Sequence, residues 1–203
     1  MPRELVPLIQ TLLWIFIGFG WRAWLQRRRH GASGIALFGT GHFFRDLRES
    51  TVVLLPAVLI AQSVLVATGS DLVRGIQISA PAGAYLCGVL LMDLGLALMV
   101  ISQVQMGKSW RIGIDDGARP GLVTAGFYSF CRNPIYFFCG LWLAGYLLIV
   151  PTWISLVLLP VCYVGVRIQV GDEEAYLLRA YGEEYRAYAA RVGRFVPGIG
   201  LLT

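Results

Sequence analysis

The stretch Cys131–Tyr136 (Cys-Arg-Asn-Pro-Ile-Tyr) combines residues that start a helix with one that binds anions. Pro134 suits the first position of a helix, because the backbone N–H that it lacks would have no partner there. Asn133 is a good N-cap, and a residue before proline is pushed out of the α region. A helix start has free N–H groups and a positive dipole end, so with Arg132 beside it this stretch predicts a site for an anionic group. The alternative is a capped membrane helix whose arginine reaches the lipid surface.

A pair of adjacent acids, Glu173–Glu174, follows the last long apolar run of the chain. Gly171 is expected to break the helix of that run, and Asp172 to cap a new one. The new helix would run from Glu173 to Val192 and end at Gly193. Apolar residues recur along it at three- and four-residue steps, which predicts a C-terminal amphipathic helix packed through one face. The members of that face are Leu178, Tyr181, Tyr185, Tyr188 and Val192.

Composition indicates a membrane protein, because 57% of the residues are hydrophobic and only 14% are charged. A helix needs roughly 20 mostly apolar residues to cross a bilayer. Apolar windows of this kind predict an all-α, polytopic bundle of about five transmembrane helices with a cytosolic loop. The windows are Leu5–Leu25, Thr51–Gly69, Ala80–Val104, Ile135–Val150 and Trp153–Val170.

Basic residues are distributed unevenly about these windows. Arg27–Arg29 follow the first window, whereas the charges of a cleaved signal peptide precede its apolar run. Cytoplasmic loops carry the excess of Lys and Arg, so the pattern predicts an outside N-terminus and a cytosolic C-terminus. Arg3 and Arg74 would then lie on the outer face. The net charge of +5 reflects this bias and contact with anionic lipids, and no nucleic-acid partner is expected.

Other polar residues are interpreted as structural. His30 and His42 have no acid or cysteine at ligand spacing and are expected at the membrane interface. Asp93 lies in the middle of the third window, where an acid costs roughly 2.5–3.5 kcal/mol on insertion scales. It either lines a pocket or is a buried carboxyl group bonded to a neighbouring helix, and the second is favoured. No metal site is predicted, because metal-ligand spacing is missing among the cysteines Cys87, Cys131, Cys139 and Cys162.

The polar segment Gly107–Phe130 separates the third and fourth windows. Its glycines, its proline and its paired acids argue for an ordered loop whose backbone approaches something closely. A simple linker would not need the apolar residues that this segment contains, so we expect the segment to pack over a site as a lid. These residues are Trp110, Leu122, Val123, Phe127 and Tyr128.

Two patterns in the second half of the chain point to a family. The first is Leu-Val-Thr-x-Gly-x-Tyr at 122–128, followed by Arg-Asn-Pro-Ile-Tyr at 132–136; the second begins at Glu173–Glu174 and continues through Tyr181–Gly182 to Arg194–Pro197. Together they resemble the membrane methyltransferases typified by isoprenylcysteine carboxyl methyltransferase and the phospholipid N-methyltransferases. The resemblance implies a single integral membrane domain, 1–203. Its residues 1–106 would be N-terminal spans, and 107–203 a catalytic half that binds S-adenosylmethionine and releases S-adenosylhomocysteine.

The resemblance also implies a cytosol-facing site. The expected cofactor contacts are Pro120, Gly121, Leu122, Val123, Tyr128, Arg132, Asn133, Pro134, Ile135, Tyr136 and Glu173. Glu174 would orient the acceptor or act as a weak base, unless it is a solvated acid of a first helical turn. Arg167 is the other catalytic candidate. The substrate would be a membrane lipid or another lipophilic or prenylated molecule.

The chain departs from the family pattern at two positions. Asn133 stands where many relatives have histidine, so it can donate a hydrogen bond but cannot titrate. The family's substrate-contacting arginine falls on Gln169, and Arg167 lies two residues away, about half a helical turn. Arg167 would therefore point elsewhere unless Gly171 lets the backbone shift. The acceptor group is accordingly left open among amine, hydroxyl, thiol and carboxyl.

Two other classes remain possible from the sequence. One is an NADPH-dependent membrane reductase of the sterol-reductase type, which shares this helical architecture. A basic cluster for its 2′-phosphate is not evident, although Arg119 and Arg194 leave it open. The other is a non-enzymatic membrane scaffold with the same fold.

Overall fold

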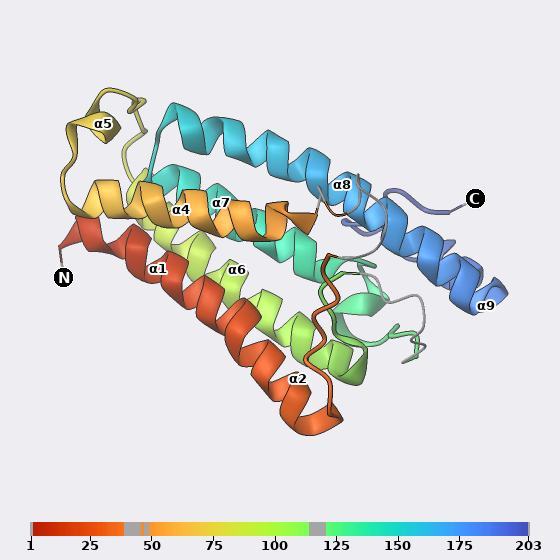
Figure 1. The fold of residues 1–203 in the computed structure, drawn as a ribbon. Helices are drawn as coiled ribbons and strands as arrows, with labels where there is room; N and C mark the ends of the chain where they lie inside the picture. The colour runs from red at the N-terminus through yellow and green to blue at the C-terminus, as the bar shows by residue number, and fades with distance from the viewer. Residues whose placement is uncertain (1, 39–45, 47–48, 114–120, 203) are drawn as a thin grey trace.

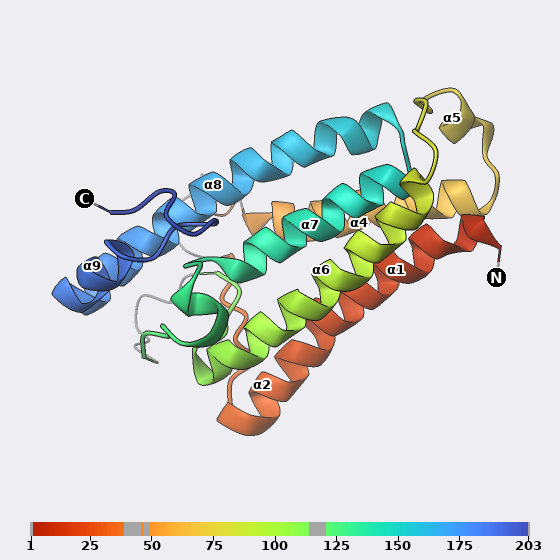
Figure 2. The ribbon, with the colours of Figure 1, turned by 180° about the vertical axis from the view of Figure 1, so that it is seen from behind.

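Helices make up the regular structure of this protein, in a computed structural model that describes residues 2–38, 46, 49–113 and 121–202. The long helices run along a common direction, with the N-terminus at the end opposite α9 and the C-terminus (Figure 1 and Figure 2). The helices are α1 (Val6–Ile15), continued by a π-helical segment (Phe16–Trp21) into α2 (Arg22–His30), then α4 (Thr51–Ala67), α5 (Asp71–Arg74), α6 (Ala84–Met106), α7 (Pro134–Ile149), α8 (Trp153–Tyr181) and α9 (Glu183–Ala189).

Each of the five apolar windows forms a helix. Three helical rods are long and apolar enough to cross a membrane by length and composition: Arg3–His30, Ala84–Ser109 and Trp153–Tyr181. The helices α4 and α7 are apolar but shorter, with 17 and 16 residues. The polytopic, all-helical membrane class is confirmed, and the number of spans stays a prediction.

Glycines bring α6 and α7 into backbone contact. A Cβ atom on Gly145 would lie 2.6 Å from the carbonyl oxygen of Gly88 and 2.9 Å from the backbone nitrogen of Met92. A Cβ atom on Gly95 would lie 2.8 Å from the backbone nitrogen of Trp142. In lipid, helices associate through close packing of small residues, because apolar side chains gain nothing by leaving the hydrocarbon. This contact fixes where α7, and therefore the stretch that precedes it, lies against α6.

Gly145→Ala is expected to lower the free energy of unfolding by about 1–3 kcal/mol, because a Cβ atom in this contact forces the two backbones apart. Gly140→Ala is the matched control on the same helix, since a Cβ atom there meets nothing within 4 Å. That change should be neutral or stabilising, because glycine is about 1 kcal/mol less favourable than alanine inside a helix. The measurement is SDS-induced unfolding of the detergent-solubilised protein, followed by circular dichroism. Equal stability of the two variants would contradict the packing argument.

Polar side chains inside the bundle bond across helices. Ser155 donates to Gln62 Oε1 at 3.3 Å, so the polar residue of α4 has a partner on α8. Gln10 Nε2 donates to Asp93 Oδ1 at 2.6 Å and links α1 to α6. The expected bond of Asp93 to a neighbouring helix is therefore present, but the expectation that its carboxyl group is buried was wrong, because Asp93 is exposed.

The last long helix does not end where the sequence suggested. α8 continues through Gly171 to Tyr181, because glycine in a helix costs only about 1 kcal/mol and the turns on either side remain bonded. The chain breaks instead at Gly182, whose φ of 53° lies in the left-handed region that favours glycine. α9 then ends at Ala189, before the predicted stop at Gly193.

Candidate functional site

The two sequence patterns meet at one end of the bundle. At this end α6 finishes, α7 begins, and α8 extends beyond its neighbours into α9 (Figure 1). The backbone N–H groups of Arg132 and Asn133 donate to the carbonyl oxygens of Gly193 (2.9 Å) and Arg194 (3.2 Å). The segment after α9 therefore lies directly against the start of α7.

Arg132 is buried, and each of the three nitrogens of its guanidinium donates to at least one acceptor. Its Nε and Nη2 each lie 2.9 Å from Glu174 Oε1. Its Nη1 donates to the carbonyl oxygens of Ala189 (2.9 Å) and Val192, and its Nη2 to that of Gly200 (2.9 Å). Arg132 thus ties the C-terminal segment to α7 and α8. A direct contact of Arg132 with a cofactor stays a prediction, and it would require one of these acceptors to be displaced.

Glu174 is the centre of a buried ion-pair network. Its Oε2 accepts a hydrogen bond from Arg194 Nη2 at 2.6 Å, and its side chain is only 6% exposed. With Arg132, two guanidinium groups supply the counter-charge that a buried carboxylate needs. The alternative of a solvated first-turn acid was wrong, because the continuous α8 helix turns Glu174 inward. Its catalytic role stays a prediction.

Asn133 occupies the N-cap position of α7, and Pro134 is the first helical residue, as predicted. The side chain of Asn133 does not cap the helix, however. Its Nδ2 donates to Glu174 Oε1 (3.3 Å) and to the carbonyl oxygen of Arg194 (3.1 Å). The residue therefore serves the Glu174 network as a neutral donor, because the amide faces α8 and the C-terminal segment.

Glu173 has quite different neighbours from Glu174. Its Oε1 accepts hydrogen bonds from Tyr136 Oη at 2.5 Å and from Gln169 Nε2 at 2.9 Å. Within the part of the chain that the structure describes, no bond is recorded to its Oε2. Tyr136 and Glu173, which the sequence assigned to the same site, are thus brought together across α7 and α8.

The register of α8 separates Arg167 from Gln169. Gln169 lies one turn before Glu173 and on the same face, as their hydrogen bond shows. Arg167 is exposed, two residues earlier on the helix. Because α8 is continuous through Gly171, no backbone shift brings Arg167 to the position of Gln169. Its catalytic role stays a prediction, although it lies away from the residues that meet around Glu173.

The predicted cofactor loop is described from Gly121 onward, and Pro120 lies outside the described residues. The backbone N–H of Gly121 donates to Tyr181 Oη at 3.0 Å. Leu122 packs on the apolar cluster of α9, which includes Tyr185 and Tyr188. The predicted aromatic face therefore packs as expected, although Gly182 divides it between two helices.

The end of this loop is anchored on α6 and α9. Tyr128 is buried; its Oη donates to the carbonyl oxygen of Ser102 (3.3 Å), and its own carbonyl accepts from Tyr188 Oη (2.6 Å). Burial raises the pKa of both tyrosines well above the ordinary value, so they are neutral donors. Val123 and Ile135 are half-buried. The loop is held from both sides, which suits the prediction that it covers a site.

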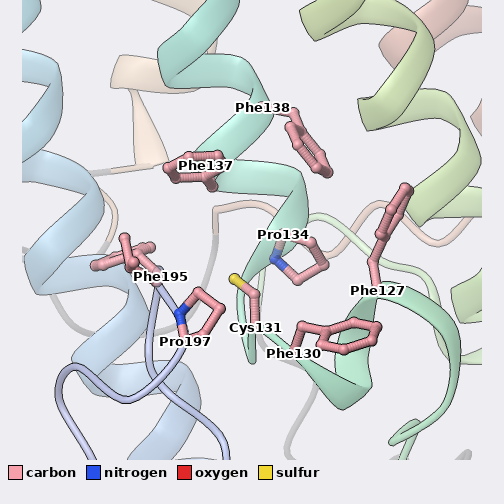
Figure 3. A pocket seen from close by; sticks show the side chains of 9 residues that line it. Phe127, Phe130, Cys131, Pro134, Phe137, Phe138, Phe195 and Pro197 are labelled. Carbon is pink, nitrogen blue, oxygen red and sulfur yellow. The ribbon is translucent and has the colours of Figure 1, made fainter.

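An apolar pocket lies beside the start of α7 (Figure 3). It opens between the end of the loop, the first turn of α7 and the segment after α9. Its walls offer aromatic, aliphatic and proline side chains, with the thiol of Cys131 as the exception. The lining residues are Phe127, Phe130, Cys131, Pro134, Phe137, Phe138, Phe195, Val196 and Pro197. The sequence did not predict this pocket, because its lining comes from the end of the loop, the start of α7 and the segment after α9, which only the tertiary fold brings together.

Cys131 is buried, and burial raises the pKa of its thiol. The thiolate is the reactive form, so a raised pKa leaves less of it at neutral pH. We expect slow alkylation of Cys131 by iodoacetamide at pH 7, with a rate that rises about tenfold per pH unit below the pKa. Mass spectrometry of the labelled peptide measures the rate, and SDS-unfolded protein is the control. Equal rates in folded and unfolded protein at pH 7 would contradict a buried, protonated thiol.

Comparisons with known proteins bear on the family and the fold of the chain. The family model described as phospholipid methyltransferase matches residues 84–184, which include α6, α7 and α8. The fold is similar to that of the eukaryotic intramembrane Ras methyltransferase ICMT (isoprenylcysteine carboxyl methyltransferase), with a TM-score of 0.66 and 16% sequence identity. That alignment covers 100% of this chain and 70% of the other. No curated protein sequence matches the chain. The match thus assigns residues 84–184 of the chain to the phospholipid methyltransferase family, and the whole chain has a fold similar to that of a membrane methyltransferase.

Proposed function

We propose that this protein transfers a methyl group from S-adenosylmethionine to a lipophilic acceptor that resides in the membrane. The observation that carries the proposal is the meeting of two sequence patterns at one end of the bundle. Tyr136 bonds to Glu173, and Arg132 and Asn133 bond to Glu174. Had these residues lain at opposite ends of the bundle, they could not belong to one site.

The residues at this end suit the cofactor in two respects. Glu173 Oε2 is an acceptor without a recorded partner among the described residues, as a ribose hydroxyl group requires. Apolar and aromatic side chains nearby offer a slot of the kind that an adenine ring occupies. Glu173, Tyr136 and the loop at 121–123 would hold the cofactor. When bound, it supplies a methyl group on a positively charged sulfur.

The chain's own residues would act by alignment and by excluding water. Methyl transfer needs the nucleophile, the methyl carbon and the sulfur in line, with the reacting atoms about 3–3.5 Å apart. A dry pocket also helps, because water is a competing nucleophile and solvates charge that the transition state disperses. The phenylalanines beside α7 would exclude water, and the Glu174 network would hold the walls in place. Such a reaction requires no catalytic dyad.

The site would face the cytosol. Arg27–Arg29 end α2, which finishes at the same end of the bundle as α9 and the C-terminus (Figure 2). Under the positive-inside rule this end is cytosolic, which puts the N-terminus outside. Basic residues at this boundary would also attract anionic lipids.

The test uses the purified full chain with labelled S-adenosylmethionine and a membrane lipid extract. Label in a lipid fraction is the expected result, together with binding of S-adenosylhomocysteine by calorimetry. Binding of NADPH instead would favour the reductase class. That class has lost one supporting residue, because Arg194 is already paired with Glu174. Binding of neither ligand would favour a scaffold and overturn the proposal.

A further inference from the structure

One carboxyl group lies on the outer side of the bundle, at the depth of the lipid hydrocarbon. Asp93 is exposed, and it is the tenth of the 23 residues of α6. It comes two residues before Gly95 at the centre of the helix, so it lies about 3 Å from the middle of the span. Its short side chain cannot reach either membrane surface from there. An acid at this depth is rare because it is costly.

The other helices have no comparable residue. No Asp, Glu, Lys or Arg occurs in Val6–Trp21, in α4, in α7, or in α8 before Arg167. α6 itself contains none besides Asp93. Most exposed side chains of these helices belong to Leu, Val and Ile, which need no partner in hydrocarbon. Asp93 is therefore a single polar group on an otherwise apolar surface.

The chain supplies only part of the hydrogen bonding that Asp93 can make. Gln10 Nε2 donates to Asp93 Oδ1 at 2.6 Å. No bond to Asp93 Oδ2 is recorded among the residues that the structure describes. Gln10 has a buried Oε1 that also has no hydrogen-bond partner within the described ranges. Hydrocarbon offers no donor or acceptor, so the second oxygen of Asp93 needs a partner from outside the chain.

Asp93 belongs to a row of exposed residues along α6, which we call the Asp93 stripe. Its members recur at steps of three and four residues, the spacing at which one helix packs along another. α6 lies between α7 and α1 (Figure 2), and the stripe is exposed because it faces neither of them. Its small alanine, one turn after the acid, would let a second helix approach closely. The members of the stripe are Leu86, Leu90, Asp93, Ala97, Ile101 and Val104.

We propose that the Asp93 stripe is the surface through which two copies of this chain pair in the membrane. Both copies insert in the same direction, so a twofold axis along the membrane normal places the two α6 helices side by side and parallel. Each residue of the stripe then lies at the depth of its counterpart, and Asp93 meets the partner's Asp93. Apolar residues on either side of the acid likewise meet apolar residues.

The chemistry of a carboxyl group suits such a pair. A protonated carboxyl group donates through one oxygen and accepts through the other, so two Asp93 side chains bond each other when at least one proton lies between them. Each gains the partner that its own chain does not supply. A helix of an unrelated protein would need a polar group at the same depth, whereas a second copy provides it by symmetry. The stripe is separate from the residues proposed to hold the cofactor, so the pairing is independent of methyl transfer.

The test measures association of the full chain in liposomes. Copies labelled at the C-terminus with donor or acceptor fluorophores are mixed, and energy transfer is followed as added lipid dilutes the protein. The natural protein is expected to show energy transfer that falls on dilution, as a monomer–dimer equilibrium requires. Asp93→Leu should raise the dissociation constant by about tenfold, the effect of one hydrogen bond between helices in lipid. Asp93→Asn should stay within about threefold of the natural protein, because an amide also donates and accepts.

Ala97→Trp and Ala61→Trp form a matched pair of controls. Both alanines are exposed, Ala97 within the stripe and Ala61 on α4. The indole ring at position 97 would block the approach of a second α6 and should abolish energy transfer. The same ring at position 61 should leave energy transfer unchanged. Ala97→Trp keeps the bond between Gln10 and Asp93, so it decides the question if Asp93→Leu does not fold.

Each outcome bears on one part of the inference. A natural protein that stays monomeric at every lipid dilution would overturn the pairing of two copies. Association that survives Ala97→Trp, or that Ala61→Trp weakens equally, would exclude the Asp93 stripe as the interface. Equal weakening by Asp93→Asn and Asp93→Leu would overturn the hydrogen-bonded pair of carboxyl groups.

Discussion

Glu174→Gln is expected to lower the free energy of unfolding by about 3–5 kcal/mol, because it leaves Arg132 buried without its counter-charge. The side chain of Arg132 is only 1% exposed, so water cannot replace the carboxylate. Three carbonyl oxygens also accept hydrogen bonds from Arg132, and they connect α7 to the segment that follows α9. Loss of the ion pair should therefore loosen that segment, and unfolding in SDS measured by circular dichroism would detect the change.

Glu184→Gln is the matched control, because it removes the same charge from an exposed position in the first turn of α9. It should change stability by less than about 0.5 kcal/mol, as most surface substitutions do. The comparison also separates two roles for Glu174. If it were mainly a catalytic base, Glu174→Gln would abolish methyl transfer and keep the stability of the natural protein.

Glu173→Gln is expected to weaken binding of S-adenosylhomocysteine by about 10- to 100-fold. A hydrogen bond to a charged group contributes about 1.5–3 kcal/mol, and each 1.4 kcal/mol is a factor of ten. The amide keeps one oxygen for Tyr136 or Gln169, but its NH₂ group cannot accept a bond from a ribose hydroxyl. Isothermal titration calorimetry on the natural protein and both glutamine variants measures the effect.

Two controls make this result interpretable. Glu184→Gln should bind S-adenosylhomocysteine as the natural protein does, because its carboxylate is exposed on α9. Glu173→Gln should unfold close to the natural protein, because no ion pair to Glu173 is recorded among the described residues. Unchanged affinity for S-adenosylhomocysteine in Glu173→Gln would remove Glu173 from the cofactor site.

The two predicted effects differ because neighbouring acids on one helix have different tasks. Glu174 faces Arg132 and Arg194 and holds the fold together at this end. Glu173 faces Tyr136 and Gln169, and no bond to its second carboxylate oxygen is recorded among the described residues. In the sequence, Glu173 and Glu174 formed a single motif, because the partners of adjacent residues cannot be assigned before the helix is placed. An α-helix turns by about 100° per residue, so the two side chains point toward different neighbours.

The amino-acid sequence was sufficient to predict the membrane class, the five apolar helices and the start of α7. These features depend on local chemistry. Long apolar runs partition into lipid, and a residue before proline is kept out of the helical region, so a helix begins at the proline. The resemblance to the membrane methyltransferases also implied that Asn133–Tyr136 and Glu173–Glu174 belong to one site.

The tertiary structure decided which partners these residues have. Gly171 proved to be an ordinary helical residue, and the helix breaks at Gly182 instead. The sequence does not distinguish the two glycines, because their backbone dihedral angles depend on the packing around them. Arg132 proved to be bonded to acceptors of the protein itself. The sequence did not predict this, because the acceptors lie more than forty residues away along the chain. The apolar pocket likewise forms only when the segment after α9 folds back beside α7. Contacts between distant segments depend on how whole helices pack, and a local sequence pattern does not determine that packing.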